Sequence, residues 1–549
     1  MNNINLKNII IESVSENKSI FAGLGSIFTG LIIAQVIFPR QYSNFVAEIP
    51  DSINNLDYKV MAFILIPYLA AELLYYVADL IDSKVMPEIE LSVIKKLSDK
   101  VFESAKTTKK EVNANELILN LKKIFDVRYG YHLITSYMLP ALVVSAGIGF
   151  YFLYADRKLG IVTLVILTMT FIALVLMGNK CFVRTNNNEK NINLFCDDVH
   201  DIFNNVDHVL VAGMEKNESK RIDNNKRELY SDCVKKERCN THLKFIFSMA
   251  YFFIMITLNG MALNLFFNGK ISKPTLVTIF FMVLALVQLY DEMLYELHNI
   301  IGAVGSYQEL ESYFKNFEIK DRTLTKKMIV DKGNIKFENI GLKYGTKVIF
   351  NNFNLQINGN SRTAIMGEIG SGKTTLFKML VDLIKYEGNI YLDNKNTKQY
   401  DYTAIIKNVA YIPQNPKLFN RTILENLKYG SDNNVDQIKN ILSHFDMLTF
   451  FDKFEKGLDT NVGKNGEKLS GGQRQFVYIL RSLIQNKKIL LFDEPSSALD
   501  ESYKKILMNI LQKINDKTII VITHDNDLLS IFDRIIVLNN GKIIEDIHN

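Results

Sequence analysis

The sequence predicts a multi-domain membrane protein: an all-α membrane domain with six transmembrane helices and long cytosolic helical extensions, followed by a soluble α/β domain. Three observations predict this fold class. Apolar residues concentrate before about residue 320, and six of their runs are long enough to cross a bilayer. After about residue 333, strand-like runs alternate with helical ones. A chain of 549 residues also exceeds one ordinary globular core.

Composition and charge exclude several classes of protein. Hydrophobic residues make up 48% and charged residues 22%, which excludes a disordered chain. The chain has 64 Lys and Arg against 59 Asp and Glu, and a net charge of +5 is too small to indicate nucleic-acid binding, so we expect no nucleic-acid partner.

The six predicted spans are each close to the ~20 residues that cross a hydrocarbon core of ~30 Å. Glu72 and Asp79 interrupt the second span, and Asp291, Glu292 and Glu296 interrupt the sixth. The first run exceeds the ~7–15 apolar residues of a signal peptide and no cleavage site follows it, so we expect a permanent helix. The spans are Ile20–Phe38, Val60–Ile81, Tyr131–Tyr154, Leu159–Met177, Leu243–Phe267 and Thr275–Leu297.

Lys and Arg predict the orientation of the chain in the lipid bilayer. They crowd the segments between the second and third spans and between the fourth and fifth spans. The positive-inside rule therefore predicts a multi-pass protein with both termini, the two long loops and the soluble domain in the cytosol. All four cysteines, Cys181, Cys196, Cys233 and Cys239, fall in the second cytosolic loop, where we expect thiols to stay reduced.

The predicted domains are a transmembrane domain at 1–319, a linker at 320–332 rich in Lys, Asp and Thr, and a soluble domain at 333–549. Apolar positions in the first long loop recur at helical spacing, which predicts helices that continue beyond the bilayer. The strand-like runs of the soluble domain are Ile335–Phe337, Thr363–Met366, Ile489–Phe492, Thr518–Ile522 and Ile535–Leu538.

The soluble domain contains a glycine-rich sequence that is typical of a phosphate-binding loop. Residues 367–374 fit G-x-x-x-x-G-K-[ST], between a predicted strand and the predicted helix Thr375–Leu383. Backbone N–H groups of such a loop surround phosphates, the lysine reaches the β and γ phosphates, and the threonine hydroxyl binds Mg²⁺. The nucleotide-binding residues predicted here are Gly367, Glu368, Ile369, Gly370, Ser371, Gly372, Lys373, Thr374 and Thr375.

Two acids end the apolar strand that follows about 120 residues later. Asp493 is placed to hold Mg²⁺, directly or through water. Glu494 is placed to orient and polarise the attacking water, because phosphoryl transfer depends mainly on positioning and charge compensation.

A second anion site is predicted at the start of the helix Gln473–Gln485. A hydroxyl and exposed N–H groups meet there at the positive end of a helix. Because one chain rarely folds so that both sites meet one nucleotide, this site is expected to serve the nucleotide of a partner copy. Its residues are Ser470, Gly471, Gly472 and Gln473.

These motifs together resemble those of the ATP-binding cassette (ABC) family. Residues 367–374 resemble its Walker A loop, Ile489–Asp493 resembles its Walker B strand, and Leu469–Gln473 resembles its signature sequence. Further positions are similar one by one. Tyr344 resembles the aromatic residue that stacks on adenine, and Gln414 the glutamine near Mg²⁺ and water. Asp500 lies in a segment similar to the D-loop, and His524 resembles the switch histidine at the γ phosphate.

Six spans followed by one such domain resemble an exporter-type half-transporter. The resemblance implies ATP and Mg²⁺ as cofactors, and a second half-transporter chain as partner, with a homodimer favoured over a heterodimer. It implies ATP hydrolysis coupled to transport, with Glu494, His524, Gln414 and Lys373 as catalytic residues and Thr374, Gln414 and Asp493 at the metal. Lys464 and Pro495 depart from what exporters of this type often carry.

Other functions stay open at this stage. An ATP-regulated channel or channel regulator is one alternative, because carboxylates within spans are costly and usually functional. An importer with the same fold is another. The transported substrate is unknown, although Asp291 and Glu296 are candidates to favour a cationic or amphipathic cargo.

Overall fold

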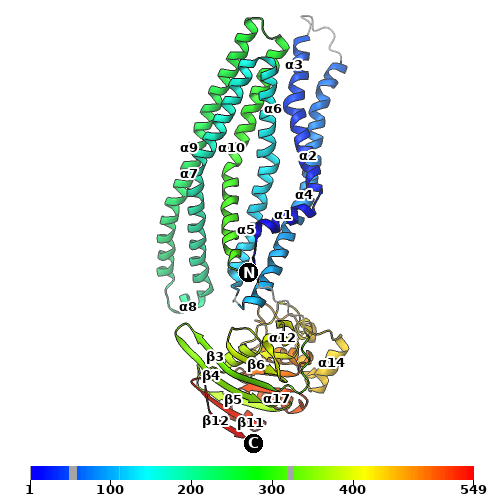
Figure 1. Cartoon of the computed structure of the whole chain (residues 1–549), viewed down its shortest axis with the longest axis vertical. Coiled ribbons are helices and arrows are strands. Elements are labelled where there is room, and N and C mark those ends of the chain that lie inside the picture. The colour runs from blue at the N-terminus through cyan, green and yellow to red at the C-terminus, as the bar shows by residue number, and fades with distance from the viewer. Residues whose placement is uncertain (1, 49–57, 110–111, 320–326) are drawn as a thin grey trace. The chain divides into compact units, whose positions relative to one another are not determined.

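The computed structural model describes residues 2–48, 58–109, 112–319 and 327–549 (Figure 1). The chain divides into two compact units. The first comprises Met1–Ala105 and Glu111–Ile319, and the second comprises Lys106–Lys110 and Lys320–Asn549. Within the predicted linker 320–332, residues 320–326 lie outside the described residues.

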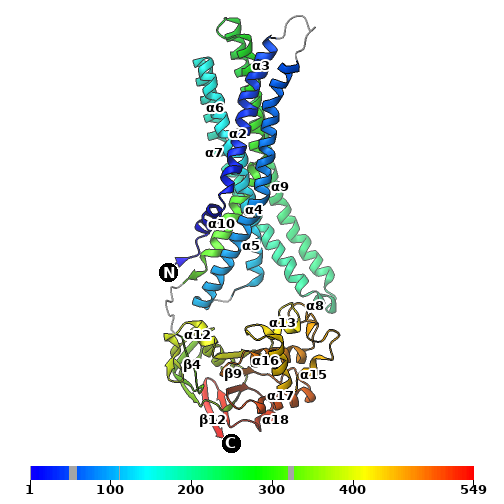
Figure 2. The same cartoon turned by 90° about the vertical axis from the view of Figure 1, so that its right-hand side faces the viewer.

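The first unit is built from long helices that run alongside one another (Figures 1 and 2). Two of these helices contain a single π-helical turn each, η1 (Ile33–Ile37) and η2 (Ile134–Met138). A short antiparallel pair, β1 (Asn2–Asn3) and β2 (Glu318–Ile319), joins the two ends of the unit. The helices are α1 (Leu6–Glu16), α2 (Ser19–Ile32), α3 (Phe38–Glu48), α4 (Tyr58–Thr108), α5 (Ala114–Leu133), α6 (Leu139–Ala155), α7 (Arg157–Asn204), α8 (Val206–Val211), α9 (Glu215–Phe267) and α10 (Lys273–Lys315).

Five helical stretches among the described residues are long and apolar enough to span a membrane, where the sequence predicts six. The remaining predicted span, Val60–Ile81, lies within α4. The structure describes its side chains only from Leu65 onward, and Glu72 and Asp79 interrupt this remainder. The five stretches are Ser19–Val46, Ala114–Ala155, Arg157–Asn204, Glu215–Phe267 and Lys273–Lys315.

A disulfide between Cys181 and Cys239 links α7 to α9. The expectation that all four thiols stay reduced is therefore wrong for this pair. The two helices lie side by side along most of their length, which brings the two Cα atoms to 5.6 Å although 58 residues separate them in sequence. Cys196 and Cys233 keep free thiols.

The second unit is an α/β domain with two sheets. The main sheet has the order β12-β11-β5-β10-β9-β8, and the four-stranded sheet has the order β4-β3-β6-β7. In the main sheet all neighbours are parallel except β12, which pairs with β11 in the antiparallel direction. The strands are β3 (Ile335–Tyr344), β4 (Lys347–Ile357), β5 (Arg362–Gly367), β6 (Glu387–Leu392), β7 (Lys395–Asn396), β8 (Val409–Ile412), β9 (Ile489–Asp493), β10 (Thr518–Ile522), β11 (Arg534–Asn539) and β12 (Lys542–His548).

Two hydrophobic cores lie on opposite faces of the main sheet. Leu490 and Phe492 of β9 point into one core, whereas Ile489 and Leu491 point into the other, as the period of two in a strand requires. Helical segments complete the unit: α11 (Lys373–Leu380), η3 (Thr397–Gln399), α12 (Tyr402–Ile406), α13 (Ile423–Lys428), α14 (Val435–His444), α15 (Leu448–Phe451), η4 (Gly457–Asp459), α16 (Gly471–Ile484), α17 (Glu501–Lys513) and α18 (Asn526–Leu529). The predicted fold class, a helical membrane region followed by a P-loop α/β domain, is confirmed.

Candidate nucleotide-binding site

The phosphate-binding loop connects β5 to α11, and its shape requires glycine at two positions. Gly367 has a φ of +143°, and a Cβ there would lie 2.0 Å from the carbonyl oxygen of Leu538. Gly372 has a φ of +103°, and its Cβ would lie 2.5 Å from Cζ of Phe350. Only a residue without a side chain fits such backbone angles and such close approaches.

Lys373 is buried at the start of α11 with its ammonium group turned back into the loop. Its Nζ donates to the carbonyl oxygens of Gly367 at 2.5 Å and Glu368 at 2.9 Å. Burial lowers the pKa of Lys373, and the nearby carboxylates of Glu494 and Asp493 act in the opposite direction. The loop thus holds a cation where phosphate groups would be bound.

Asp493 ends β9 as a buried carboxyl group with two hydroxyl donors. The Thr374 hydroxyl donates to Oδ1 at 3.1 Å, and the Tyr411 hydroxyl donates to Oδ2 at 3.1 Å. Burial raises the pKa of Asp493, and the hydrogen bonds from Thr374 and Tyr411 oppose this rise. The carboxylate and the threonine hydroxyl therefore stand together beside the loop.

This donor set fits Mg²⁺. Mg²⁺ takes oxygen ligands and is usually held by one or two carboxylates, waters and substrate phosphates. Asp493 and Thr374 supply such oxygens, and their hydrogen bond shows that they reach the same point. Within the described residues no group of three His, Cys, Asp or Glu side chains is arranged to hold a metal ion.

Glu494, Gln414 and His524 form a third group beside Asp493. Gln414 donates from Nε2 to the Glu494 carboxylate, and Nε2 of His524 lies 3.7 Å from Oε1 of the same carboxylate. Glu494 has a φ of +49°, a backbone conformation that is costly for a residue with a side chain and that concentrates at functional sites. The unusual backbone aims the carboxylate between the glutamine and the histidine.

The predicted signature residues lie at the first turn of α16. Ser470 is the N-cap and exchanges hydrogen bonds with Gln473, at 3.2 Å to the serine hydroxyl and 2.9 Å to the glutamine oxygen. A Cβ on Gly472 would lie 3.2 Å from the Leu499 side chain, so this turn packs against the segment before α17. Asp500 caps α17, accepting from the Tyr503 N–H at 2.9 Å.

The described contacts therefore divide the predicted site residues into two groups. The first surrounds the loop and joins Lys373, Thr374, Asp493 and Glu494 through hydrogen bonds and charge interactions. The second comprises the ends of α16 and α17, whose polar contacts stay within their own first turns. Tyr344 lies apart at the end of β3 and is 50% exposed, and Ile369 on the loop is 98% exposed.

Tyr411 belongs to no motif that predicts a role for it. Its hydrogen bond to Asp493 depends on strand pairing, because β8 lies parallel to β9 with Tyr411 opposite Leu491. The available signal was a tyrosine three residues before Gln414, in a segment where the sequence analysis predicts no strand. Its partner strand, however, lies about 80 residues away.

Comparisons with known proteins agree with this geometry. Residues 350–497 match the ABC transporter family. ABC transporter B family member 2 of Dictyostelium discoideum is 36% identical over 39% of this chain and 16% of its own length. A lipid A-core flippase of Desulfotalea psychrophila, named as ATP-dependent, is 34% identical over 42% of this chain and 41% of its own length. A Rickettsia typhi protein that is named as an export ATP-binding/permease protein is 27% identical over 71% of this chain and 69% of its own length.

A solved structure shares the fold of nearly the whole chain. The structure of a bacterial Atm1-family ABC exporter with ATP bound superimposes with a TM-score of 0.81 at 20% identity, covering 99% of this chain and 96% of that one. The chain therefore has the fold of an ABC exporter, and residues 350–497 are those of an ABC transporter domain. It carries an ATP-binding domain and is an integral membrane protein, as the sequence predicts.

Proposed function

We propose that this chain is an ATP-driven exporter, in which ATP hydrolysis by the second unit drives alternating access of the helical unit across the bilayer. One observation carries the proposal: Lys373, Asp493 and Glu494 converge beside one phosphate-binding loop. Phosphoryl transfer needs this convergence, because its catalysis consists of positioning and charge compensation. The exporter fold and the ABC transporter match support the coupling to transport.

Each residue around the loop has a distinct part in the proposed hydrolysis. The Lys373 ammonium would leave its backbone partners to contact the β and γ phosphates. Thr374, Asp493 and Gln414 would hold Mg²⁺, which neutralises charge on the phosphate oxygens. Glu494 would accept a hydrogen bond from the attacking water, while Gln414 and His524 hold its carboxylate in place.

The test is Glu494→Gln in the full chain, because this change removes the charge that polarises water and keeps the shape of the side chain. We expect phosphate release to fall by about a thousandfold, on the order of a lost catalytic group, while ATP stays bound. Glu501→Gln is the matched control, since Glu501 is an exposed glutamate of α17 outside the site. Undiminished hydrolysis in Glu494→Gln would refute the assignment.

The second group of site residues supports a dimer. We place Ser470, Gly471, Gly472 and Gln473 of one copy against the nucleotide bound by Lys373 of another, with Asp500 beside it. Every consensus residue is present in one chain, which favours a homodimer, with a heterodimer as the alternative.

Mixing two inactive chains tests this arrangement. One chain carries Lys373→Ala and the other Ser470→Arg, so that each homodimer lacks an intact site. In a mixed dimer with shared sites, one site combines both defects and the other is intact. The mixed dimer therefore has one intact site where the unaltered dimer has two. We expect it to hydrolyse ATP at up to about half the rate of the unaltered dimer. Co-expressed variants that stay as inactive as each variant alone would exclude shared sites.

We place both termini and the second unit in the cytosol, because Lys and Arg concentrate in the two long loops on that side. Two alternatives keep the same nucleotide chemistry. An ATP-regulated channel or channel regulator would pass ions without turnover, whereas an exporter moves substrate only while ATP is split. An importer would reverse the direction of flux in sealed vesicles. Flux measured in reconstituted vesicles with Glu494→Gln distinguishes the channel from the transporter.

A further inference from the structure

A cavity of about 540 Å³ lies inside the helical unit. Residues from α2 to α3, α4, α5 to α6 and α10 line it, and each of these segments carries a predicted span. Its volume is within the ~300–1,000 Å³ of sites that bind drug-sized molecules. The first unit alone therefore forms a chamber large enough for an organic molecule.

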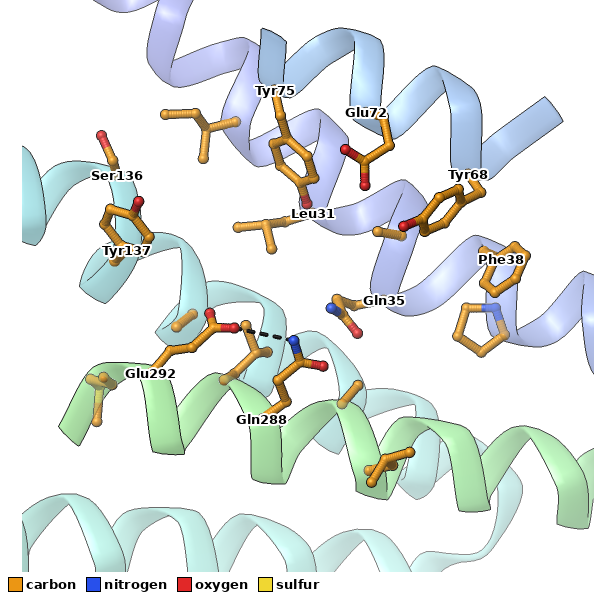
Figure 3. A pocket seen from close by; sticks show the side chains of 18 of the residues that line it. Leu31, Gln35, Phe38, Tyr68, Glu72, Tyr75, Ser136, Tyr137, Gln288 and Glu292 are labelled. Atoms are coloured by element: carbon orange, nitrogen blue, oxygen red, sulfur yellow. Dashed lines mark hydrogen bonds between the residues drawn. The ribbon is translucent and has the colours of Figure 1, made fainter. Parts of the chain in front are cut away.

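The charged residues on the wall of this cavity are acidic. Glu72 and Asp79 come from α4. Glu292 comes from α10, on another side of the chamber from Glu72 (Figure 3). Among the described residues that line the cavity there is no Lys or Arg. His132 also lines it, but its Nδ1 is engaged 2.7 Å from the carboxylate of Asp82. The lining thus carries an excess of negative charge, which favours a cation.

Aromatic rings accompany the acids. Tyr68, Glu72, Tyr75 and Asp79 follow one another at spacings of three and four residues, so they share one face of α4. Figure 3 shows the Glu72 carboxylate between the rings of Tyr68 and Tyr75. Phe38 extends this surface, with its ring centroid 5.8 Å from that of Tyr68. Aromatic faces attract cations, most strongly where water is excluded.

The acids are dispersed rather than clustered. Within the described residues no three acidic, histidine or cysteine side chains are close enough to hold a metal ion. Negative charge spread around a chamber of this size matches a bulky cation with diffuse charge, whereas a divalent metal requires oxygens gathered at about 2–2.6 Å. The cavity is therefore suited to an organic cation.

Both π-helical turns that the structure describes in this unit lie at the cavity. Gln35 belongs to η1, and Ser136 and Tyr137 belong to η2, and all three line the chamber. Such turns interrupt the regular ladder of a helix and occur frequently at functional sites. Opposite η1, Gln288 donates to Glu292 at 3.1 Å and thereby orients this carboxylate (Figure 3).

We propose that this cavity binds the transported substrate, and that the substrate is an organic cation with an aromatic or apolar body. The proposal rests on the exporter function proposed above. It also revises which acids of the sixth span matter. Glu292 lines the cavity, whereas Glu296 accepts a hydrogen bond from Asn299 at 2.7 Å and neither Glu296 nor Asp291 belongs to the lining.

The test compares two ions of the same shape and opposite charge. Tetraphenylphosphonium and tetraphenylborate each carry four phenyl rings. Binding of each labelled ion to the full chain in lipid nanodiscs is measured by equilibrium dialysis, with empty nanodiscs subtracted. We expect the cation to bind at least about tenfold more tightly, because a single well-placed charge accounts for a difference of that order. Equal affinities, or no saturable binding of the cation, would overturn the proposal.

Variants of the lining locate the bound ion. Glu72→Gln and Glu292→Gln remove one charge each at unchanged shape, and we expect each to weaken tetraphenylphosphonium binding by about tenfold. Asp291→Asn removes a neighbouring charge from the same helix outside the lining and leaves the affinity unchanged. Glutamine variants that bind as tightly as Asp291→Asn would overturn the assignment of the site. The comparison of the two ions on the unaltered chain stands if a variant does not fold.

The two proposals fail separately. Dialysis measures binding without ATP, so its outcome does not depend on hydrolysis by Glu494. A chain that hydrolyses ATP but binds both ions equally keeps the proposed exporter function and loses only the cationic substrate. The opposite outcome is also distinct. If the chain selects the cation but releases phosphate equally with and without the Glu494 carboxylate, the proposed exporter function fails and the cation site stands.

Discussion

A buried arginine in the second unit provides the sharpest test of the fold around the nucleotide site. Arg481 is 4% exposed on α16, the helix that begins with the predicted signature residues. Its Nε donates to the carbonyl oxygen of Asn426 at 2.6 Å, and Nη2 donates to the Asn426 side-chain oxygen at 2.6 Å. The guanidinium also lies over the rings of Tyr478, Tyr429 and Phe419. Arg481 thus links α16 to α13.

Arg481→Met keeps much of the side-chain volume and removes both donors. Two buried acceptors on Asn426 lose a hydrogen bond from a charged group, at about 2 kcal/mol each, for a total of about 4 kcal/mol. For a domain of this size, 1 kcal/mol corresponds to about 3 °C in the unfolding midpoint, so the midpoint should fall by about 12 °C. The assay is calorimetry of the full chain in detergent, with the transition of the second unit identified by its upward shift on ATP binding.

Arg421→Met is the matched control. Arg421 is exposed and lies over two of the same rings, Phe419 at 5.0 Å and Tyr429 at 5.9 Å from their centroids. Each cation–π contact at an exposed site contributes about 0.5–1 kcal/mol, so the two contacts contribute at most about 2 kcal/mol and the midpoint should fall by no more than about 6 °C. Equal shifts for Arg481→Met and Arg421→Met would show that ring contact, rather than the hydrogen bonds to Asn426, stabilises this region, and would refute the reasoning.

Three further predictions concern the loop, an acid-sensitive turn and the thiols. Gly372→Ala should abolish binding of a fluorescent ATP analogue, because its φ of +103° and its contact with Phe350 admit no Cβ, and adding Phe350→Leu should restore only part of the binding. Burial alone would raise the pKa of Asp393, but four backbone and side-chain hydrogen bonds from residues 332–334 outweigh it and hold the pKa below its usual value. The stability that Asp393 contributes is therefore complete above the ordinary aspartate pKa of about 3.9 and lost as pH falls through the lower folded value, so thermal scans from pH 6 to pH 3 should fall more steeply for the native chain than for Asp393→Asn. Maleimide–polyethylene glycol should modify two thiols in the unreduced, denatured chain and four after reduction, because Cys181 and Cys239 are joined; four in both states would contradict the disulfide.

The local structure of the candidate nucleotide site was largely predictable because its residues follow one another in short segments with fixed geometry. The loop at 367–374, the acids after β9 and the N-cap at Ser470 each depend on local backbone structure, which the neighbouring residues determine. Tyr411 was missed because its contact with Asp493 requires β8 and β9 to be neighbours in the sheet. Strand order depends on tertiary packing and leaves no local signal.

The helical unit was less predictable for the same reason. Hydropathy indicates where spans lie but not which faces of different spans meet, so Glu292 could not be separated from Asp291 and Glu296 as a lining residue. The disulfide between α7 and α9 likewise depends on the packing of two helices whose cysteines are 58 residues apart. By contrast, the shared face of Tyr68, Glu72, Tyr75 and Asp79 was already present in their spacing.

The two proposed sites are both built from local structure that costs free energy. In the second unit, Glu494 adopts a φ of +49° at the end of an otherwise regular buried strand. In the first, Glu72 and Glu292 lie in predicted spans and two helices contain a π-helical turn beside them. A strained glutamate and acids in the bilayer persist only where the surrounding packing outweighs their cost. If they had no function, replacing them would remove this cost, stabilise the chain and leave binding unchanged. We propose instead that Glu494 acts in ATP hydrolysis and that Glu72 and Glu292 bind an organic cation. This hypothesis predicts that Glu72→Gln and Glu292→Gln lower the affinity for the cation even where they raise the unfolding temperature.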